Sequence, residues 1–458
     1  MDRRIRKPDM TGNGSTLDMT SGRPSALLLR FSVPLILGNL FQQLYTFADT
    51  IIVGQKLGVT ALSALGASEW LCFMMFGLVQ GMTQGFSIGI SKHFGEGRND
   101  LVQKGIFQAA CVSAGAALLV TAIGQGTLVP ALKLLRTPAE LFGMTRLYLE
   151  ILYIGIPVSF AGNMLAAILR AFGNSRAPLY AMASASIANI FLDILFVMVL
   201  GMGIRGAAYG TLLSQLCAAV CCGLALKKTG MAKVERENRK PDGRMMLAQI
   251  RLGVPMGFQN IITAVGGLAV QSVVNGFGIL FLAGYTAANK LYGLLETAAS
   301  SYGYAISTYT AQNVGAGRKD RIRSGILSAL AIGTVTACLM SSVMAVLGRP
   351  ILTLFIAGGQ VNTGAAIQTG YHFLCILAVF FPLLYAVYIL RSCIQGMGNS
   401  TMPMLSSLIQ VVMRIVCASA VTGLIGNTGV FWGEVMAWLG ADLFLASALL
   451  YRYKRLEI

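Results

Sequence analysis

Long apolar runs recur from one end of this chain to the other, and they constrain its fold more than any other feature. Many exceed 18 residues, long enough for a helix to cross about 30 Å of hydrocarbon. Only 12% of the residues are charged, about half the fraction that a soluble domain carries. The sequence therefore predicts an all-α polytopic membrane protein.

The apolar runs divide into twelve expected transmembrane helices, six on each side of a polar linker at 228–249. The spans are 30–56, 60–90, 105–128, 141–169, 178–200, 206–227, 251–276, 281–312, 324–347, 364–393, 403–424 and 429–450. We expect cytoplasmic tails at 1–29 and 451–458, an N-terminal lobe at 30–227 and a C-terminal lobe at 250–450.

The basic residues are segregated along the chain. Of the 35 Lys and Arg residues, 27 lie in segments that follow every second apolar run. Because positive residues gather on the cytoplasmic side, this bias predicts a protein of the cell's inner membrane with both termini and the linker in the cytoplasm. Anionic lipid headgroups, rather than nucleic acid, are the expected partners of this basic surface, despite a net charge of +17.

The two halves of the chain resemble each other. The segment from Gly95 to Asp100 recurs 220 residues later, and Gly173-Asn174-Ser175 recurs 225 residues later as 398–400. Six helices per half is an even number, so both copies insert with the same orientation, related by a pseudo-twofold axis along the membrane normal. Such pairs are typical of transporters.

A polar pair interrupts the run from Pro178 to Leu200: Asn189 and Asp193, which a spacing of four places on one helix face. An acid at this depth usually has a function, although helix packing is the alternative. Asp49 sits at a similar depth, ~10 Å below the outer surface, and Thr211 follows near the start of its own helix. Two carboxylates, an amide and a hydroxyl could hold a small cation or share a proton.

Several other residues are second-tier candidates. Tyr45 lies one turn before Asp49, with lobe packing as the alternative; Glu69 and Glu296 are acids at membrane depth with cavity or structural roles. Pro34 is expected to kink the first helix. In the C-terminal lobe, the repeat alignment places Arg414 opposite Asn189 and Glu434 opposite Thr211, which predicts a structural ion pair instead of a cation site.

Over residues 25–450 the chain resembles the multidrug and toxic compound extrusion (MATE) family. The resemblance rests on the paired Gly-x-Gly-Arg-x-Asp loops, the segment 169–175, Pro34 with Asp49, and Asn189 with Asp193. It implies export of cationic, amphipathic compounds against inward H⁺ or Na⁺, with a bend at Pro34 linked to protonation. In one branch of that family, the residues that form the cation site resemble Asp49, Asn189, Asp193 and Thr211 of this chain.

These observations predict a monomeric secondary antiporter that works by rocker-type alternating access. Its partner is a small cationic, amphipathic substrate, and it has no cofactor beyond the coupling ion, H⁺ or Na⁺ at the four-residue set. One alternative is a flippase for lipid-linked oligosaccharides. Families that it would resemble have an inward cavity lined by Arg and Lys, and the first two helices here offer no such lining residue beyond Arg30. The other is a membrane-embedded enzyme, for which no catalytic constellation is evident.

Overall fold

The computed structural model describes residues 16–230, 234–356 and 363–455, and every regular element within them is a helix. Parts of the expected tails and linker lie outside the described residues. The chain forms two compact units: unit 1 holds 33–260 with the described residues before Gly22, and unit 2 holds Gly22–Ser32 and the described residues from Ile261 onward. The linker thus lies within unit 1, and the division of the chain into two lobes at the linker stays a prediction.

The first helix, α1 (Pro24–Glu96), runs for 73 residues and contains a break at Gly58. At 1.5 Å per residue its length far exceeds one membrane crossing. Gly58 has φ 79° and ψ −173°, a conformation that residues with a Cβ rarely adopt. Helical angles resume after it, so α1 supplies the first two expected spans.

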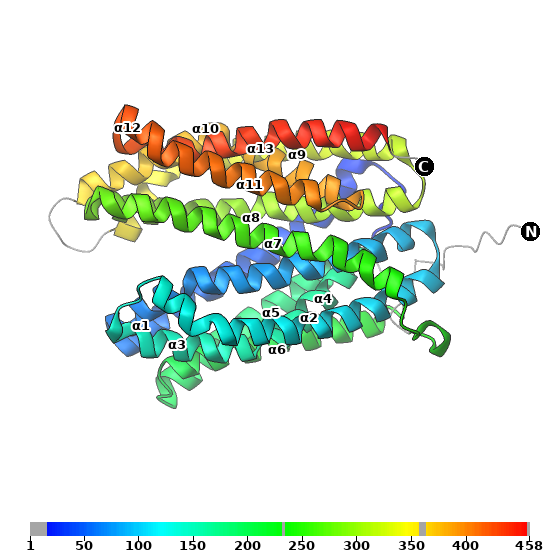
Figure 1. Cartoon of the computed structure of the whole chain (residues 1–458), viewed down its shortest axis with the longest axis horizontal. Coiled ribbons are helices and arrows are strands. Elements are labelled where there is room, and N and C mark those ends of the chain that lie inside the picture. Colours follow the sequence, from blue (N-terminus) through cyan, green and yellow to red (C-terminus); the bar gives the residue numbers. More distant parts are fainter. Residues whose placement is uncertain (1–15, 231–233, 357–362, 456–458) are drawn as a thin grey trace, which may run out of the picture. The chain divides into compact units, whose positions relative to one another are not determined.

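The rest of unit 1 is built on α6 (Ile204–Lys228), which packs against α3 (Ala139–Ile154), α4 (Ile156–Ala171) and α5 (Arg176–Asp193) (Figure 1). The helix α2 (Asn99–Leu134) packs on α3 and α4. Between α3 and α4 the chain bends by 49° at Gly155. A Cβ there would lie 1.9 Å from a terminal methyl of Leu212 of α6, so a larger residue would have to displace that side chain.

Unit 2 contains most of the remaining helices. The helix α7 (Gly243–Val274) crosses the boundary between the units at Asn260 and ends in a short 3₁₀ turn, η4 (Asn275–Phe277). The long helices α8 (Ile279–Gly315) and α9 (Lys319–Ile356) both pack on α10 (Thr363–Gly396). The chain then continues through α11 (Thr401–Val416), the π-turn η5 (Cys417–Val421), α12 (Thr422–Ile425), η6 (Gly426–Thr428) and α13 (Gly429–Lys454).

By length and apolar composition, eight described helices can each cross a membrane, and the bent pair α3 and α4 makes a ninth. Two of the eight are too long for one crossing: α1 with 73 residues and the continuous stretch 401–454 with 54. Glycines with positive φ interrupt them, Gly58 in α1 and Gly426 before α13. The all-helical membrane fold expected from the apolar runs is confirmed.

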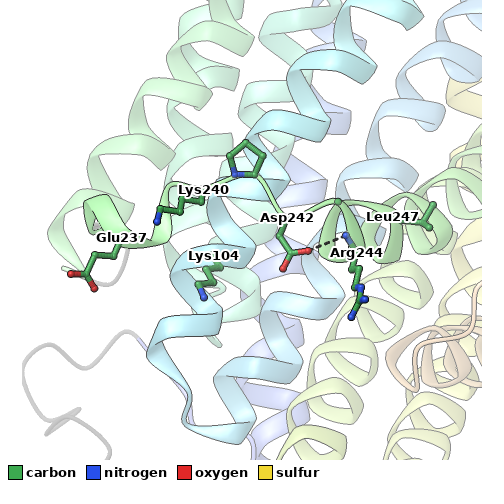
Figure 2. A pocket seen from close by; sticks show the side chains of 8 residues that line it. Lys104, Glu237, Lys240, Asp242, Arg244 and Leu247 are labelled. Carbon is green, nitrogen blue, oxygen red and sulfur yellow. Dashed lines mark hydrogen bonds between the residues drawn. The ribbon is translucent and has the colours of Figure 1, made fainter.

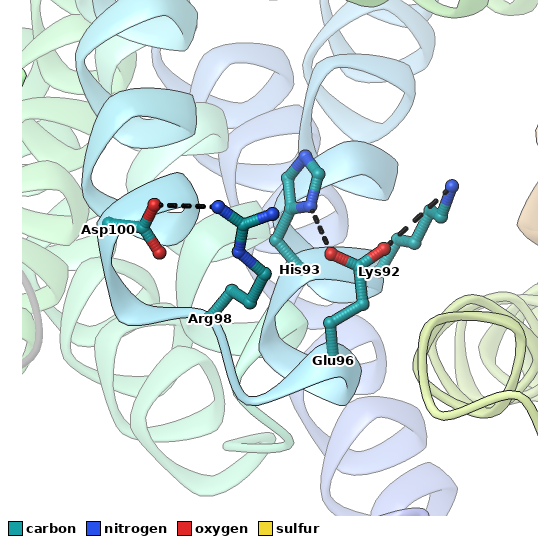
Figure 3. Close-up of polar contacts among 5 residues, drawn as sticks. All are labelled: Lys92, His93, Glu96, Arg98 and Asp100. Atoms are coloured by element: carbon teal, nitrogen blue, oxygen red, sulfur yellow. Dashed lines mark hydrogen bonds and ion pairs between the residues drawn. The ribbon is translucent and has the colours of Figure 1, made fainter. Parts of the chain in front are cut away.

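The repeated Gly-x-Gly loops are helix endings of one type. After α1 the amide of Gly97 donates to Phe94 and that of Arg98 to His93; after α8 Gly317 donates to Val314 and Arg318 to Asn313. Both glycines have positive φ, as this kind of C-cap requires. In the first copy Glu96 also contacts His93 at 2.8 Å, and Arg98 contacts Asp100 at 3.0 Å (Figure 3).

The repeated Gly-Asn-Ser motif ends one helix and starts the next. Gly173 and Gly398 have φ of 77° and 81°, and each ends its helix with the same pair of backbone hydrogen bonds. The Asn174 side chain then accepts from the amide of Ala177 at 3.0 Å, and Asn399 does the same for Met402 at 3.1 Å. These motifs are therefore turn-forming in both halves.

Side chains of α2 and α7 hold the described part of the linker. Gln103 accepts hydrogen bonds from the Glu235 amide and the Asn238 side chain, and Gln108 donates to the Lys240 carbonyl at 2.7 Å. From α7, the buried Gln249 donates back to the Gly105 carbonyl at 2.9 Å. A surface hollow of about 640 Å³ lies beside these contacts (Figure 2). Its charged lining residues are Lys104, Glu237, Lys240, Asp242 and Arg244.

Candidate cation-coupling site

The site begins at the end of α5, where Asn189 and Asp193 are both completely buried. They lie one turn apart on the face of α5 that points into unit 1. Directly after Asp193 the helix widens into a π-turn, η2 (Ile194–Val199), in which the amide of Leu200 donates to the carbonyl of Leu195. π-turns occur often at functional sites, and the sequence analysis did not predict this one.

The carboxylate of Asp193 reaches the neighbouring helix α6 at Gly210. A Cβ added to Gly210 would lie 2.2 Å from Oδ1 of Asp193, so no larger residue fits there without displacing the carboxylate. Thr211, the next residue on α6, is half-buried. The sequence analysis selects Thr211 and does not select Gly210. The one sequence feature that points to Gly210 is a glycine directly beside a candidate ligand.

Asp49 comes from the first part of α1 and is buried, with 8% of its surface exposed. The charge of Asp49 acts on Asp193, so two carboxylates that repel each other lie inside unit 1. Tyr45, one turn earlier on α1, and Tyr148 of α3 both interact electrostatically with the two carboxylates. The structure therefore brings Tyr45 to the site, and it adds Tyr148, which sequence reasoning did not select.

Most polar atoms of this cluster lack a hydrogen-bond partner among the described residues. The unpartnered buried atoms are Oδ1 of Asp49, both side-chain polar atoms of Asn189 and both carboxylate oxygens of Asp193. Leaving a buried polar group unpaired costs about 1–3 kcal/mol, so such a cluster is normally retained for a purpose. Its oxygens are the ligands that a small hard cation prefers, and either carboxylate can also take a proton.

The other candidates lie elsewhere. Glu69, on the second part of α1, is exposed. Glu296 belongs to α8 in unit 2, where the hydroxyl of Tyr388 donates to it at 2.7 Å. Pro34 lies inside α1, whose non-helical angles fall at Gly58. The kink expected at Pro34 stays a prediction.

In unit 2, Arg414 of α11 and Glu434 of α13 come together. The Nη2 atom of Arg414 lies 2.7 Å from Oε2 of Glu434, and the two side chains are 9% and 13% exposed. Arg414 aligns with Asn189 and Ala418 with Asp193 in the internal repeat. At positions that match in the repeat, unit 1 thus buries groups without partners among the described residues and unit 2 buries a member of a compensated pair.

A helical membrane protein with an internal repeat and a buried acid pair has the make-up of a transporter. The MatE family model matches residues 34–195 and, a second time, residues 255–419. The chain therefore belongs to the MATE family of transporters. This assignment rules out the membrane-embedded enzyme, because the MATE family consists of transporters and not of enzymes.

Three similar proteins illustrate the relationship. A probable multidrug resistance protein of Bacillus subtilis, YpnP, is 29% identical over 96% of this chain and 97% of its own length. An FAD transporter of Shewanella oneidensis is 24% identical over 73% of this chain and 75% of its own. A solved outward-facing multidrug resistance MATE transporter of the MOP superfamily shares the fold, with a TM-score of 0.89, 20% identity, and coverage of 96% and 98%.

Proposed function

We propose that this protein is a secondary antiporter that exports amphipathic organic cations in exchange for H⁺ or Na⁺. The observation that carries the proposal is the cluster of Asp49, Asn189 and Asp193, in which four buried side-chain oxygens are unpartnered among the described residues: Oδ1 of Asp49, Oδ1 of Asn189 and both carboxylate oxygens of Asp193. A bound cation or proton would supply the missing partner and offset the repulsion between the two carboxylates. The multidrug names of several relatives support the substrate class.

Coupling follows from differential affinity. The ion and the substrate must favour different states of the transporter, because a ligand shifts an equilibrium only by the difference between its affinities for the two states. Asp49 and Asp193 bind the ion, Asn189 contributes a neutral oxygen, and Thr211 adds its hydroxyl when the ion is Na⁺. Alternating access then moves the substrate outward, with both termini of the monomer in the cytoplasm and anionic lipids around the basic loops.

The test is efflux from vesicles that contain the purified protein. A pH gradient and a sodium gradient are imposed separately, and export of a cationic dye is followed, with FAD as a competitor because one relative is an FAD transporter. We expect one gradient to drive dye export. Absence of export under both gradients, by protein that is correctly inserted, would contradict the antiport.

The same vesicles address the flippase alternative. A flippase would move a fluorescent lipid-linked saccharide between the leaflets with no imposed ion gradient, and the dye would not compete. The antiporter predicts no such lipid movement. A lipid signal that is abolished by Asp193→Asn would favour the flippase.

A further inference from the structure

The buried face of α11 is polar, which is unusual for a helix in a membrane protein. Ser406, Ser407, Gln410 and Arg414 are buried, while Leu408 and other large apolar residues of the helix are exposed. The spacing of three and four residues places the polar set in one stripe. Because α11 packs on α10 and α13, this stripe makes the interior between the three helices polar.

The contacts between α11 and α13 set their register. Arg414 pairs with Glu434, and a Cβ added at Gly440 would lie 3.4 Å from Ile409 and 3.2 Å from Met413. Residue numbers thus fall along α11 as they rise along α13, so the helices are antiparallel. Asp442, two residues beyond Gly440, is therefore level with the part of α11 from Ser406 to Gln410.

A guanidinium lies at the same level. Arg391 of α10 is buried, with 6% of its surface exposed, and its Nη2 atom donates to Oγ of Ser406 at 3.5 Å. The positive charge of Arg391 acts on Asp442. Yet no hydrogen bond joins Asp442 to Arg391 or to any other residue in the described part of the chain, and both of its carboxylate oxygens are buried.

Both hydrogen-bond acceptors and hydrogen-bond donors in this region lack partners among the described residues. The acceptors are the two oxygens of Asp442, and the donors include Nε of Arg391, Oγ of Ser407 and Nε2 of Gln410, each without a partner among the described residues. Ordered water, which typically makes about three hydrogen bonds when buried, can join such donors and acceptors. Water between the three helices would satisfy all of them.

The other charged and titratable groups on the elements that pack near Asp442 have partners of their own or lie on a different contact. On α11, Arg414 is engaged with Glu434 of α13. The segment 417–428 between these helices contains no Asp, Glu, Lys, Arg or His, and Cys417 is its titratable group. On α10, Tyr388 donates to Glu296 of α8, and Arg391 lies 5.9 Å from the centre of the Tyr388 ring. Within the described ranges, Asp442 therefore has neither a direct ion pair nor a direct hydrogen-bond donor.

We propose that Asp442 is a proton-binding residue of unit 2 that exchanges protons through water along the polar face of α11. When Asp442 is ionised, it attracts Arg391; when it is protonated, Arg391 is released towards Ser406. Asp442 lies eight residues before the expected end of its span at 450, ~12 Å from the side expected to be cytoplasmic. The inference rests on the proposed antiport for its role in transport, but the protonation itself does not depend on it.

Infrared difference spectroscopy of the purified protein tests the protonation directly. Upon pH titration, we expect one protonated-carboxyl band to be lost in Asp442→Asn, retained at a shifted position in Asp442→Glu, and moved by exchange into D₂O. Asp320→Asn, which removes an exposed carboxyl of the same unit, is the control and should leave that band unchanged. An Asp442→Asn spectrum identical to that of the wild type would overturn the proposal.

Transport provides the second readout. In vesicles, the pH on each side is varied separately, and dye efflux by Asp442→Asn should lose its dependence on the pH of the side where α11 begins. An Asp442→Asn variant that keeps the wild-type dependence would exclude a role in transport. Failure of the wild type to export dye under any gradient would instead contradict the proposed function, while the infrared result would still decide the protonation.

Discussion

Gly210 of α6 stands directly against the carboxylate of Asp193 of α5, at a distance that leaves no room for a Cβ. We expect Gly210→Ala to push the carboxylate out of its position, at a cost of about 1–3 kcal/mol in the free energy of unfolding. Gradient-driven efflux per inserted molecule should fall strongly. Gly223→Ala on the same helix is the control, since its Cβ would meet Leu165 at an ordinary 3.7 Å. Equal efflux in the two variants would refute this placement of Asp193.

Removing either acid of the site should abolish coupling and leave the fold intact. Asp49→Asn and Asp193→Asn each delete a buried charge that has no ion-pair partner among the described residues, so both variants should insert normally. They should lose ion-driven efflux yet still bind dye, as measured by fluorescence polarisation. Glu150→Gln, in a surface pair with Arg146, should behave as the wild type. Wild-type efflux by Asp193→Asn would remove α5 from the coupling site.

The pair formed by Arg414 and Glu434 should be structural. Arg414→Met leaves Glu434 buried and unpaired, which destabilises by about 3–5 kcal/mol, whereas Arg414→Met with Glu434→Gln removes both charges and should be much milder. Thermal unfolding in detergent measures these two variants and Glu434→Gln alone. If the damage of the double variant equals the sum of the two single changes, the two residues do not compensate each other.

The linker should be cytoplasmic. In a cysteine-free background, Lys240→Cys should resist a membrane-impermeant thiol reagent in intact cells and react in inverted vesicles. Ile279→Cys, at the start of α8 just beyond the far end of α7, is the matched site and should show the reverse pattern. Labelling of position 240 from outside would invert the proposed topology.

Much of the fold follows from the apolar runs, because any helix in lipid must satisfy its own backbone and be long enough to cross. The same reasoning could not predict that the first two spans join into one element, since a single glycine, Gly58, turns the chain with no polar loop. The repeated Gly-Asn-Ser motif was detectable from the sequence. Its function as a paired C-cap and N-cap became clear only from its hydrogen bonds.

The site was predictable in its acids and less so in its surroundings. Asp49 and Asp193 are conspicuous because charges are costly at membrane depth. Tyr148 and Gly210 are ordinary residues in apolar helices, and only the packing of α3 and α6 brings them to the acids. Asp442 lies inside an expected span, but its position relative to Arg391 depends on how α10, α11 and α13 pack, which the hydrophobic periodicity of the sequence does not specify.

The π-turn that follows Asp193 has a counterpart in the second half of the chain. The turn η5 (Cys417–Val421) lies at nearly the matching place in the internal repeat, and Ala418, the residue aligned with Asp193, is buried within it. The widened helix is therefore a property of both copies, and the carboxylate is a property of one. The chain is therefore symmetric in this backbone irregularity and asymmetric in the charge placed beside it.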